Sequence, residues 1–396
     1  MTHSNPILIV GGGLGGLTTA LALAQRGRAS RVLEGAVEFG AIGYGIQFGP
    51  NVFHVFARLG LMDQVLAVAD SPVAVLMRDA LDGKELVRIP TGDSFRARFR
   101  YPYIIVHRID LHNVLLDACR QNPAIELVAD AMAIGFEDRG DGVAVTTADG
   151  RTFSGAAVVA SDGIRSLFRQ RLIGDGERAV GYAALRTIVP MAEVKADVSR
   201  DSVVLWGGPG CHIVHYPLRH GSEFNIVAVF RTSTYAEKSD AASCRAELEE
   251  TYGHAHPAMR ALIAMMDLRW RRSVGDRDPV RHWHKGRVAL LGDAAHAPLQ
   301  SLAQGAGMAI EDGLCLGEAI HGADGDYHAA FKRFEAARLV RTARVQLESR
   351  ALWHLYHCDG IDREVRNATV AGWDEAHMYD CLSWLYDGAP VASAGR

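Results

Sequence analysis

Residues 7–25 have the sequence ILIVGGGLGGLTTALALAQ, and this stretch decides the fold. The apolar run Ile7–Val10 predicts a buried strand, and the alanine- and leucine-rich run after the glycines predicts a helix. The pattern G-x-G-x-x-G lies between them, from Gly11 to Gly16. In such a turn Gly11 permits the sharp bend, Gly13 lets a pyrophosphate approach the backbone, and Gly16 lets the helix pack close to the strand. The free amides at the helix start then face the phosphates.

An acidic residue follows at the spacing that a nucleotide site requires. A second strand-like run, Ser30–Leu33, delivers Glu34 about 20 residues after the glycines. An acid at this place is expected to hydrogen-bond a ribose hydroxyl of an adenine dinucleotide. A glycine-rich turn alone is weak evidence, but the strand, helix and acid together indicate a dinucleotide-binding unit rather than a purely structural turn.

The composition excludes several classes of protein. With 396 residues, of which 48% are hydrophobic, the chain can form two or three domains. The net charge is −4 without a run of five like charges, so neither nucleic acid nor an anionic membrane is an expected partner. No apolar run approaches the roughly 18 residues of a membrane span. The first strand begins at residue 7, which leaves no room for a signal peptide, and we expect a cytoplasmic protein.

The cysteines and histidines do not indicate a metal site. The six cysteines are scattered without C-x-x-C spacing, which favours reduced thiols over disulfides or zinc ligands. The pairs His282/His284 and His354/His357 lack a third ligand at a suitable spacing. We therefore expect no metal.

Further along the chain, the pattern alternates between two kinds of structure. Residues 38–51 carry four glycines and a proline, which predicts a long functional loop. Short strand-like runs at 73–100 interrupt the nucleotide-binding unit, and antiparallel strands are expected between 184 and 231. A long amphipathic helix is predicted at Tyr327–Tyr356, and the aromatic residues of the tail suggest subunit or interdomain packing, or plain core.

Two more motifs and one arginine stand at strand ends. Asp162-Gly163 opens the pattern D-G-x-x-S-x-x-R after an apolar strand, and Gly292-Asp293 ends another. Arg108 lies at a strand end just before a helix, where a surface ion pair is the alternative to a ligand contact.

The strand at 211–218 carries two histidines on opposite faces. Period-two geometry places His212, Val214 and Tyr216 on one face and Ile213 and His215 on the other. Each histidine is a candidate base or a satisfied structural group.

Together the three motifs show that the sequence resembles the single-component flavin-dependent aromatic hydroxylases of the para-hydroxybenzoate hydroxylase fold over nearly its whole length. The resemblance implies an α/β fold in which a Rossmann-like FAD-binding domain (1–72, 101–180 and 275–340) is interleaved with an antiparallel-sheet substrate domain (73–100 and 181–274). A C-terminal helical region (341–396) completes the chain. FAD and NADH as cofactors, a small aromatic acid and O₂ as substrates, and a homodimer are also implied.

The resemblance also assigns site residues. Asp162 is implied to support the FAD and NAD(P)H sites together, and the helix start near 305–308 faces the anionic edge of reduced flavin. The absence of an arginine cluster at a second nucleotide site favours NADH over NADPH. The implied FAD contacts are Gly11, Gly13, Leu14, Gly15, Gly16, Glu34, Arg108, Asp162, Asp293, Gly305, Ala306 and Met308.

One departure from the family pattern points to the substrate. Most members of the family continue G-D-A-A-H-x-x-x-P-x-x-G-Q-G, whereas this chain has Gln300 in place of the proline and Ala303 in place of the first later glycine. On the basis of Gln300, Cys211-His212 and the run 215–219, the sequence is most similar to members that hydroxylate 3-hydroxybenzoate para to its hydroxyl. Members that act on salicylate are the nearest alternative. The sequence does not single out the group that binds the carboxylate.

Phenol chemistry then gives these residues their expected roles. Oxygen insertion needs a ring whose hydroxyl is losing its proton, so we expect His212 to act as the base, Gln300 to assist by a hydrogen bond, and Tyr216 to position the ring. A flavin reductase without oxygen insertion and a non-catalytic flavoprotein remain alternatives, because FAD motifs do not report the fate of oxygen.

Overall fold

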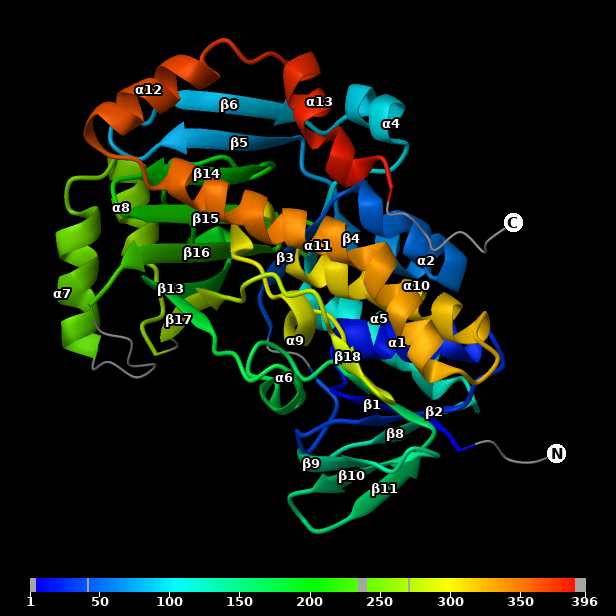
Figure 1. Cartoon of the computed structure of the whole chain (residues 1–396). Coiled ribbons are helices and arrows are strands. Elements are labelled where there is room, and N and C mark those ends of the chain that lie inside the picture. Colours follow the sequence, from blue (N-terminus) through cyan, green and yellow to red (C-terminus); the bar gives the residue numbers. More distant parts are fainter. Residues whose placement is uncertain (1–4, 41–42, 234–240, 270, 389–396) are drawn as a thin grey trace.

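Two large sheets of different kinds organise the chain (Figure 1). The computed structural model describes residues 5–40, 43–233, 241–269 and 271–388. The first sheet is parallel except at its β18–β19 edge. Its strand order is β18 (His284–Lys285), β19 (Val288–Leu290), β12 (Ala157–Ala160), β1 (Ile7–Val10), β2 (Ser30–Leu33) and β8 (Ile125–Val128). Loops at the carboxyl ends of such strands form ligand sites in open α/β sheets.

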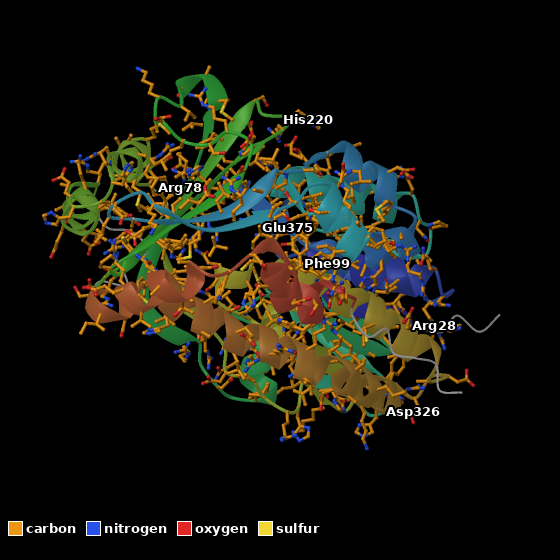
Figure 2. The ribbon with its side chains drawn as sticks, turned by 90° about the horizontal axis from the view of Figure 1, so that it is seen from above. Arg28, Arg78, Phe99, His220, Asp326 and Glu375 are labelled. Atoms are coloured by element: carbon orange, nitrogen blue, oxygen red, sulfur yellow. The ribbon has the colours of Figure 1, made fainter. Side chains whose placement is uncertain are left out.

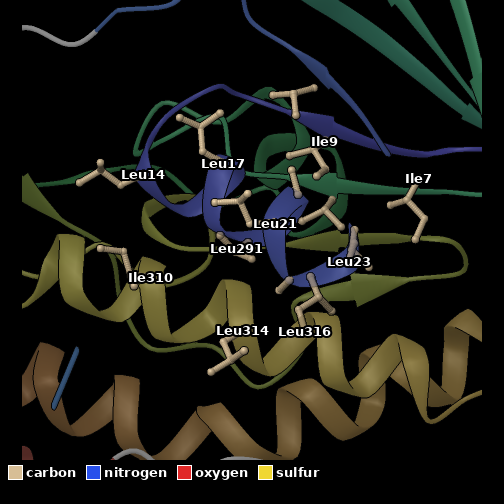
Figure 3. Packing of buried hydrophobic residues seen from close by; sticks show 14 of the residues in the cluster. Ile7, Ile9, Leu14, Leu17, Leu21, Leu23, Leu291, Ile310, Leu314 and Leu316 are labelled. Atoms are coloured by element: carbon tan, nitrogen blue, oxygen red, sulfur yellow. The ribbon is translucent and has the colours of Figure 1, made fainter. Parts of the chain in front are cut away.

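Helix α1 (Leu14–Ala24) lies between the parallel sheet and helix α10 (Gly305–His321). Figure 3 shows Leu17 and Leu21 of α1 between Ile9 of β1 and Leu314 of α10. Every residue of α1 from Leu14 to Leu23 is buried, which explains why its sequence is apolar on all sides rather than amphipathic. Helix α5 (Arg108–Arg120) also packs against α1.

The second sheet has seven strands and forms the other half of the molecule. Neighbouring strands are antiparallel except β14 and β5, which are parallel. The order is β17 (Arg271–Asp276), β13 (Arg178–Pro190), β16 (Glu223–Arg231), β15 (Cys211–Leu218), β14 (Val203–Gly208), β5 (Ala74–Asp79) and β6 (Glu85–Pro90). The insertion at 73–100 therefore supplies two strands to this sheet, and the antiparallel prediction for 184–231 is confirmed.

Helices cover both faces of the seven-stranded sheet. Helices α7 (Ala241–Tyr252) and α8 (Pro257–Ile263) pack on one face, where Leu248 and Met259 join its core. On the other face runs α11 (Tyr327–Tyr356), whose predicted bounds are confirmed (Figure 1). Because α11 is continuous, the expected boundary between 340 and 341 falls inside one helix. With these helices, the α/β architecture expected from the sequence is confirmed.

Smaller elements complete the fold. The predicted loop at 38–51 is partly wrong, because Gly45–Phe48 forms strand β3, which pairs with β7 (Ile104–His107). Ala41 and Ile42 lie outside the described residues. The other strands are β4 (Ala69–Asp70), β9 (Ala133–Asp138), β10 (Val143–Thr147) and β11 (Thr152–Gly155). The other helices are α2 (Phe53–Leu59), α3 (Met62–Ala67), α4 (Asp93–Phe99), α6 (Leu167–Leu172), α9 (Asp293–His296), α12 (Gly360–Val370) and α13 (Glu375–Tyr386), with 3₁₀ turns η1 (Pro50–Val52), η2 (Met191–Glu193) and η3 (Gln300–Leu302).

The C-terminal helix closes on the insertion. Helix α13 packs against α4, and Figure 2 labels one residue of each, Glu375 of α13 and Phe99 of α4. The rings of Phe99 and Tyr379 lie 5.5 Å apart edge to face. Within the described part of the chain, no helix has both the length and the apolar character that crossing a membrane requires.

Candidate active site

A cavity of about 720 Å³ joins the two halves of the molecule. It reaches from the glycine turn after β1 to the face of β15 that lies toward α11, and part of α13 closes it. Of the residues that the sequence assigned to the cofactor or to catalysis, those that line this cavity are Gly13, Leu14, Gly15, Arg108, His212, Tyr216, Asp293, Gln300, Gly305 and Ala306. The two groups of predicted residues, for nucleotide and for substrate, therefore face one space.

The glycine turn has the geometry that a bound diphosphate needs. Gly11 has a φ of +105°, which favours glycine, and a side chain there would clash with the carbonyl of Ser161. A Cβ on Gly16 would clash with the carbonyl of Gly11, so this glycine allows close packing of strand and helix. A Cβ on Gly13 would meet nothing within 4 Å and would stand on the cavity side. The open approach at Gly13 fits a pyrophosphate.

The first turn of α1 is free to bind an anion. Its N-cap, Gly13, has no side chain to cap the helix, and the first turn contains no acidic residue. The amides of the first turn have no acceptor within the helix, and the helix dipole makes this end positive. Leu14 and Gly15, both in this turn, line the cavity. These donors fit the phosphates of a dinucleotide.

Glu34 follows β2 and reaches back to the glycine turn. One carboxylate oxygen accepts a hydrogen bond from the backbone N–H of Gly12 at 2.7 Å, and the other accepts from Ala36 at 2.9 Å. Each oxygen keeps a further lone pair, because a carboxylate has about four acceptor sites. The structure thus brings the predicted ribose acid beside the predicted pyrophosphate turn.

Arg108 and Asp293 both reach into the cavity. Arg108 begins α5, its side chain is exposed, and it forms no ion pair with any described residue, unlike the surface pair considered as the alternative. Asp293 is exposed toward the cavity, where desolvation by the surrounding protein raises its pKa, while His296 and Arg108 act in the opposite direction. A cation and a carboxylate without committed protein partners fit the phosphate and hydroxyl groups of FAD.

Asp162 holds its loop instead of lining the cavity. Its Oδ2 accepts a hydrogen bond from the N–H of Leu167 at 2.9 Å, at the start of α6, and burial raises its pKa although Ser166 lowers it. Its buried Oδ1 has no hydrogen-bond partner among the described residues. The neighbours Ser161 and Gly163 line the cavity, so Asp162 borders the site without facing it.

The structure does not bring Met308 to the cavity. Its side chain is fully buried, and its backbone N–H donates to the carbonyl of Gln304 at 2.8 Å. Ala309, one residue further along α10, lines the cavity. The motif did not indicate which residues of α10 face the cavity, because the first turn of this helix consists mostly of small residues.

The predicted faces of β15 are confirmed. His212, Val214 and Tyr216 line the cavity, whereas Ile213 joins the core under α7 and α8. His215 lies on that opposite face, where its Nε2 accepts a hydrogen bond from the indole N–H of Trp206 at 3.1 Å. Burial lowers the pKa of His215 to about 3. His215 is therefore a neutral structural group.

His212 is held neutral in the cavity wall. It is 1% exposed, and burial together with His357 holds its pKa well below the ordinary value. Its Nδ1 lies 2.8 Å from Nε2 of His357, at the end of α11. Because Nδ1 is occupied, Nε2 is the nitrogen that remains for a ligand. A neutral imidazole with one free nitrogen can accept a proton.

Tyr216 lies in the same wall of the cavity. A Cβ on Gly45 would lie 2.7 Å from its hydroxyl oxygen, so the ring packs directly on β3. Burial raises the pKa of Tyr216, although Arg186 and Gln47 oppose this. The phenol therefore stays protonated and can donate a hydrogen bond.

Gln300 is oriented by an arginine that the sequence reasoning missed. Nη2 of Arg186, on β13, donates to Oε1 of Gln300 at 2.9 Å. Burial lowers the pKa of Arg186, and no described carboxylate forms an ion pair with it. Ala303, just after Gln300, has a φ of +54°, a strained conformation where the family pattern has glycine. The signal for Arg186 was its position as a charged residue within the mostly apolar second half of β13.

The C-terminal aromatics line one end of the cavity. Trp373, Trp384 and Tyr386 all face this space, together with Tyr356 at the end of α11. The sequence suggested subunit or interdomain packing for the tail, or plain core. The large number of aromatic residues in the tail indicated that it is packed against other elements. No sequence motif indicated that it lines the same cavity as the glycine turn.

A buried charge network supports the loop that carries Asp293 and Gln300. Asp312 accepts hydrogen bonds from the N–H of Gly292 at 3.1 Å and from Nε2 of His296 at 2.6 Å. Arg338 of α11 donates to Asp312 at 2.7 Å and to Glu311 at 2.7 Å. The network ties the Gly292-Asp293 turn to α10 and α11.

Comparisons with known proteins agree with this site. Residues 4–324 match the family described as FAD binding domain. The chain is 39% identical over 381 residues to 3-hydroxybenzoate 6-hydroxylase of Polaromonas naphthalenivorans (strain CJ2), covering 96% of this chain and 95% of that protein. It is 38% identical over 380 residues to 3-hydroxybenzoate 6-hydroxylase of Klebsiella oxytoca, covering 96% of each.

A solved structure has the same fold over the whole length. The crystal structure of a variant of Klebsiella pneumoniae HpxO complexed with FAD superposes with a TM-score of 0.85 at 25% identity, over 98% of this chain and 99% of that one. The uncapped start of α1, the open approach at Gly13 and these matches lead to one assignment. The chain belongs to the FAD binding domain family, among flavoprotein hydroxylases related to 3-hydroxybenzoate 6-hydroxylase.

Proposed function

We propose that this protein hydroxylates 3-hydroxybenzoate para to its hydroxyl group, giving 2,5-dihydroxybenzoate (gentisate), with FAD, NADH and O₂. The observation that carries the proposal is that His212, Tyr216 and Gln300 face the same cavity as the glycine turn. The relatives at 38–39% identity are named for this reaction and support the choice of substrate.

FAD is held, in this proposal, by the 11–16 turn, Glu34, Arg108, Asp293 and the start of α10. When bound, FAD would pass the electrons of NADH to O₂ and so make one oxygen atom of O₂ electrophilic. Asp162 shapes the loop between the FAD site and the site of NADH.

His212 takes the phenolic proton through Nε2. An ordinary phenol has a pKa of about 10 and an ordinary histidine about 6.5, a gap of about 5 kcal/mol, and the burial of His212 widens it. The transfer is therefore coupled to oxygen attack on the ring and is assisted by a donor at the phenol oxygen.

Gln300 is that donor. Because Arg186 occupies Oε1 of Gln300, the amide presents its N–H₂ group to the substrate. The nearby positive charge of Arg186 favours the phenolate over the phenol. Tyr216 positions the ring on the same strand face.

The test is the product formed by the FAD-loaded enzyme. We expect 3-hydroxybenzoate to stimulate NADH oxidation and to yield gentisate, with salicylate and 4-hydroxybenzoate turned over poorly. Catechol formed preferentially from salicylate would support a salicylate hydroxylase. NADH oxidation without any hydroxylated product would indicate a reductase, and no stimulation by any substrate would favour a binding protein.

The proposal also includes NADH as the electron donor, a cytoplasmic location and a homodimer. Val340 and Leu347 support a dimer contact, because they are 78% and 54% exposed one heptad apart on α11. The six free cysteines support a reducing compartment. Equal kcat/KM values for NADH and NADPH would contradict the preference for NADH. A monomer in analytical ultracentrifugation would contradict the homodimer.

A further inference from the structure

Two buried histidines form a hydrogen-bonded pair in the cavity wall. His212 lies on β15 and His357 caps α11, so the pair joins the sheet to the end of the 30-residue helix. Nδ1 of His212 and Nε2 of His357 are 2.8 Å apart, and the two residues are 1% and 7% exposed. Only His212 lines the cavity. His357 can therefore reach a ligand only through His212.

Aromatic rings enclose the pair. Tyr182 stacks on His357 with ring centroids 4.6 Å apart, and Trp353 packs edge-on against both imidazoles at 5.3 Å and 4.7 Å. No described carboxylate forms an ion pair or hydrogen bond with either histidine. The orientation of the His212 ring thus depends on His357 and on the rings around it.

The tautomer of His357 decides which of the two histidines donates the hydrogen bond. The nitrogen not bonded to His212 is Nδ1, which has no hydrogen-bond partner of its own among the described residues. A neutral imidazole carries one N–H, so a proton on Nδ1 leaves Nε2 of His357 as an acceptor. In that tautomer of His357, His212 donates from Nδ1.

Both rings are neutral before substrate reacts. Burial lowers the pKa of His357 to about 3, with Arg231 and His354 acting in the same direction. Burial and His357 hold the pKa of His212 well below its ordinary value. A single proton therefore occupies the bond between the rings.

We propose that His357 is a positioning residue, which accepts the Nδ1 hydrogen of His212 and thereby fixes the tautomer that presents Nε2 of His212 as the base. The inference rests on the proposed function. In the step it supports, the phenol O–H bond breaks, the electron pair stays on the phenol oxygen, and the proton joins Nε2 of His212. The resulting imidazolium keeps its Nδ1–H bond to His357, which shares the new charge.

Two variants of His357 separate this role from packing. His357→Phe keeps an aromatic ring but removes the acceptor, whereas His357→Gln keeps an acceptor at the end of a side chain of similar reach. His354→Phe is the matched control, because His354 is exposed three residues earlier. All are measured as FAD-loaded enzymes, and gentisate formation by the wild type is established first, so that failure of the proposed function is recognised separately.

Two readouts report on the base. The first is gentisate formed per NADH consumed, with H₂O₂ measured in parallel. The second is the ¹³C shift of the hydroxyl-bearing carbon of labelled 3-hydroxybenzoate on the oxidised enzyme, as the pH rises toward the ordinary phenol value of about 10. We expect His357→Phe to slow hydroxylation by at least about tenfold and to raise the pKa of the bound phenol. His357→Gln should recover most of the hydroxylation rate and most of the shift in the phenol pKa. His354→Phe should match the wild type in both.

Wild-type coupling and a wild-type phenol titration in His357→Phe would overturn the inference. If both His357 variants lose FAD or melt early, ¹⁵N NMR of histidine-labelled wild-type enzyme decides, with His212→Ala used for assignment. A protonated Nδ1 on His212 supports the inference, and a protonated Nε2 overturns it.

Discussion

The guanidinium of Arg186 donates to Oε1 of Gln300 at 2.9 Å, and this bond sets which end of the Gln300 amide faces the substrate cavity. Arg186 lies on β13, whereas Gln300 begins the η3 turn that follows α9, so the bond joins the seven-stranded sheet to the loop after Asp293. Because the oxygen is taken, the amide N–H₂ group is the part available to a phenolate. The positive charge lies one hydrogen bond behind that donor.

Replacing Arg186 tests whether this charge activates the phenol. Arg186→Met removes the charge and frees Gln300 to turn, so we expect the pKa of bound 3-hydroxybenzoate to rise by about 1 to 3 units and coupling to fall. Arg186→Lys keeps the charge without the planar fork and should show a smaller effect. A phenol titration unchanged in Arg186→Met would remove Arg186 from ring activation.

Two glycines of the same turn should respond in opposite ways to one added methyl group. At Gly13 the methyl would meet no protein atom, so Gly13→Ala should leave the melting temperature of the apoprotein unchanged. FAD affinity should still fall about tenfold or more, a loss of about 1.4 kcal/mol, because the methyl stands where the pyrophosphate is expected. At Gly16 the methyl would clash with the carbonyl of Gly11, so Gly16→Ala should destabilise the apoprotein by about 1 to 3 kcal/mol.

Thermal melts with and without FAD distinguish the two glycine variants. Full FAD affinity in Gly13→Ala would mean that the cofactor does not approach the backbone at this turn.

Glu34 should contribute to FAD retention through its carboxylate. Glu34→Ala removes a charge-assisted hydrogen bond to the expected ribose hydroxyl, worth about 1.5 to 3 kcal/mol. The substitution also leaves the N–H groups of Gly12 and Ala36 without their acceptor. Glu34→Gln, which keeps one acceptor oxygen, is the control for this backbone effect. Equal FAD dissociation constants in wild type and Glu34→Ala would exclude Glu34 from the cofactor site.

The network behind the Gly292-Asp293 turn should make stability sensitive to acid. Burial by itself raises the pKa of Asp312, but His296 and Arg338 outweigh it and hold the value at about 2, against an ordinary 3.8. A lowered pKa stabilises the folded state above the unfolded value and loses that contribution as the pH falls toward 2. The contribution is about 2 kcal/mol.

Denaturant unfolding of the FAD-loaded enzyme between neutral pH and pH values below that of an ordinary carboxylate measures this effect. Asp312→Asn should unfold more easily at neutral pH and should lose part of the decline that the wild type shows in acid. An acid decline of equal steepness in both proteins would contradict the role assigned to Asp312.

Local patterns allowed much of the site to be predicted. The glycine turn, the strand before it and Glu34 are close in sequence, and their roles follow from backbone geometry alone. Period-two alternation was sufficient to separate His212 and Tyr216 from His215, because both faces of β15 are buried and its register is strongly specified. The helix at 327–356 was also predicted from periodicity, because the helical spacing of its apolar residues continues over 30 residues.

Contacts between distant segments were not predictable in the same way. His357 meets His212 across 145 residues, and Arg186 meets Gln300 across 114. Neither belongs to a spaced motif, and a single sequence contains no signal for which strand face meets which helix end. Strand β3 was missed within 38–51 because its glycines and proline are typical of loops, although four residues pair with β7.

The role of His212 as the base can be measured in one experiment, the yield of gentisate per NADH in His212→Ala. His215→Ala serves as the control, because it removes a histidine of the same strand from the opposite face. We predict that His212→Ala binds FAD and still shows substrate-stimulated NADH oxidation, since neither requires ring activation. Its hydroxylation step should slow by about 10² to 10⁴-fold, so that H₂O₂ replaces gentisate as the main product. Wild-type gentisate yield in His212→Ala would contradict the assignment of the base.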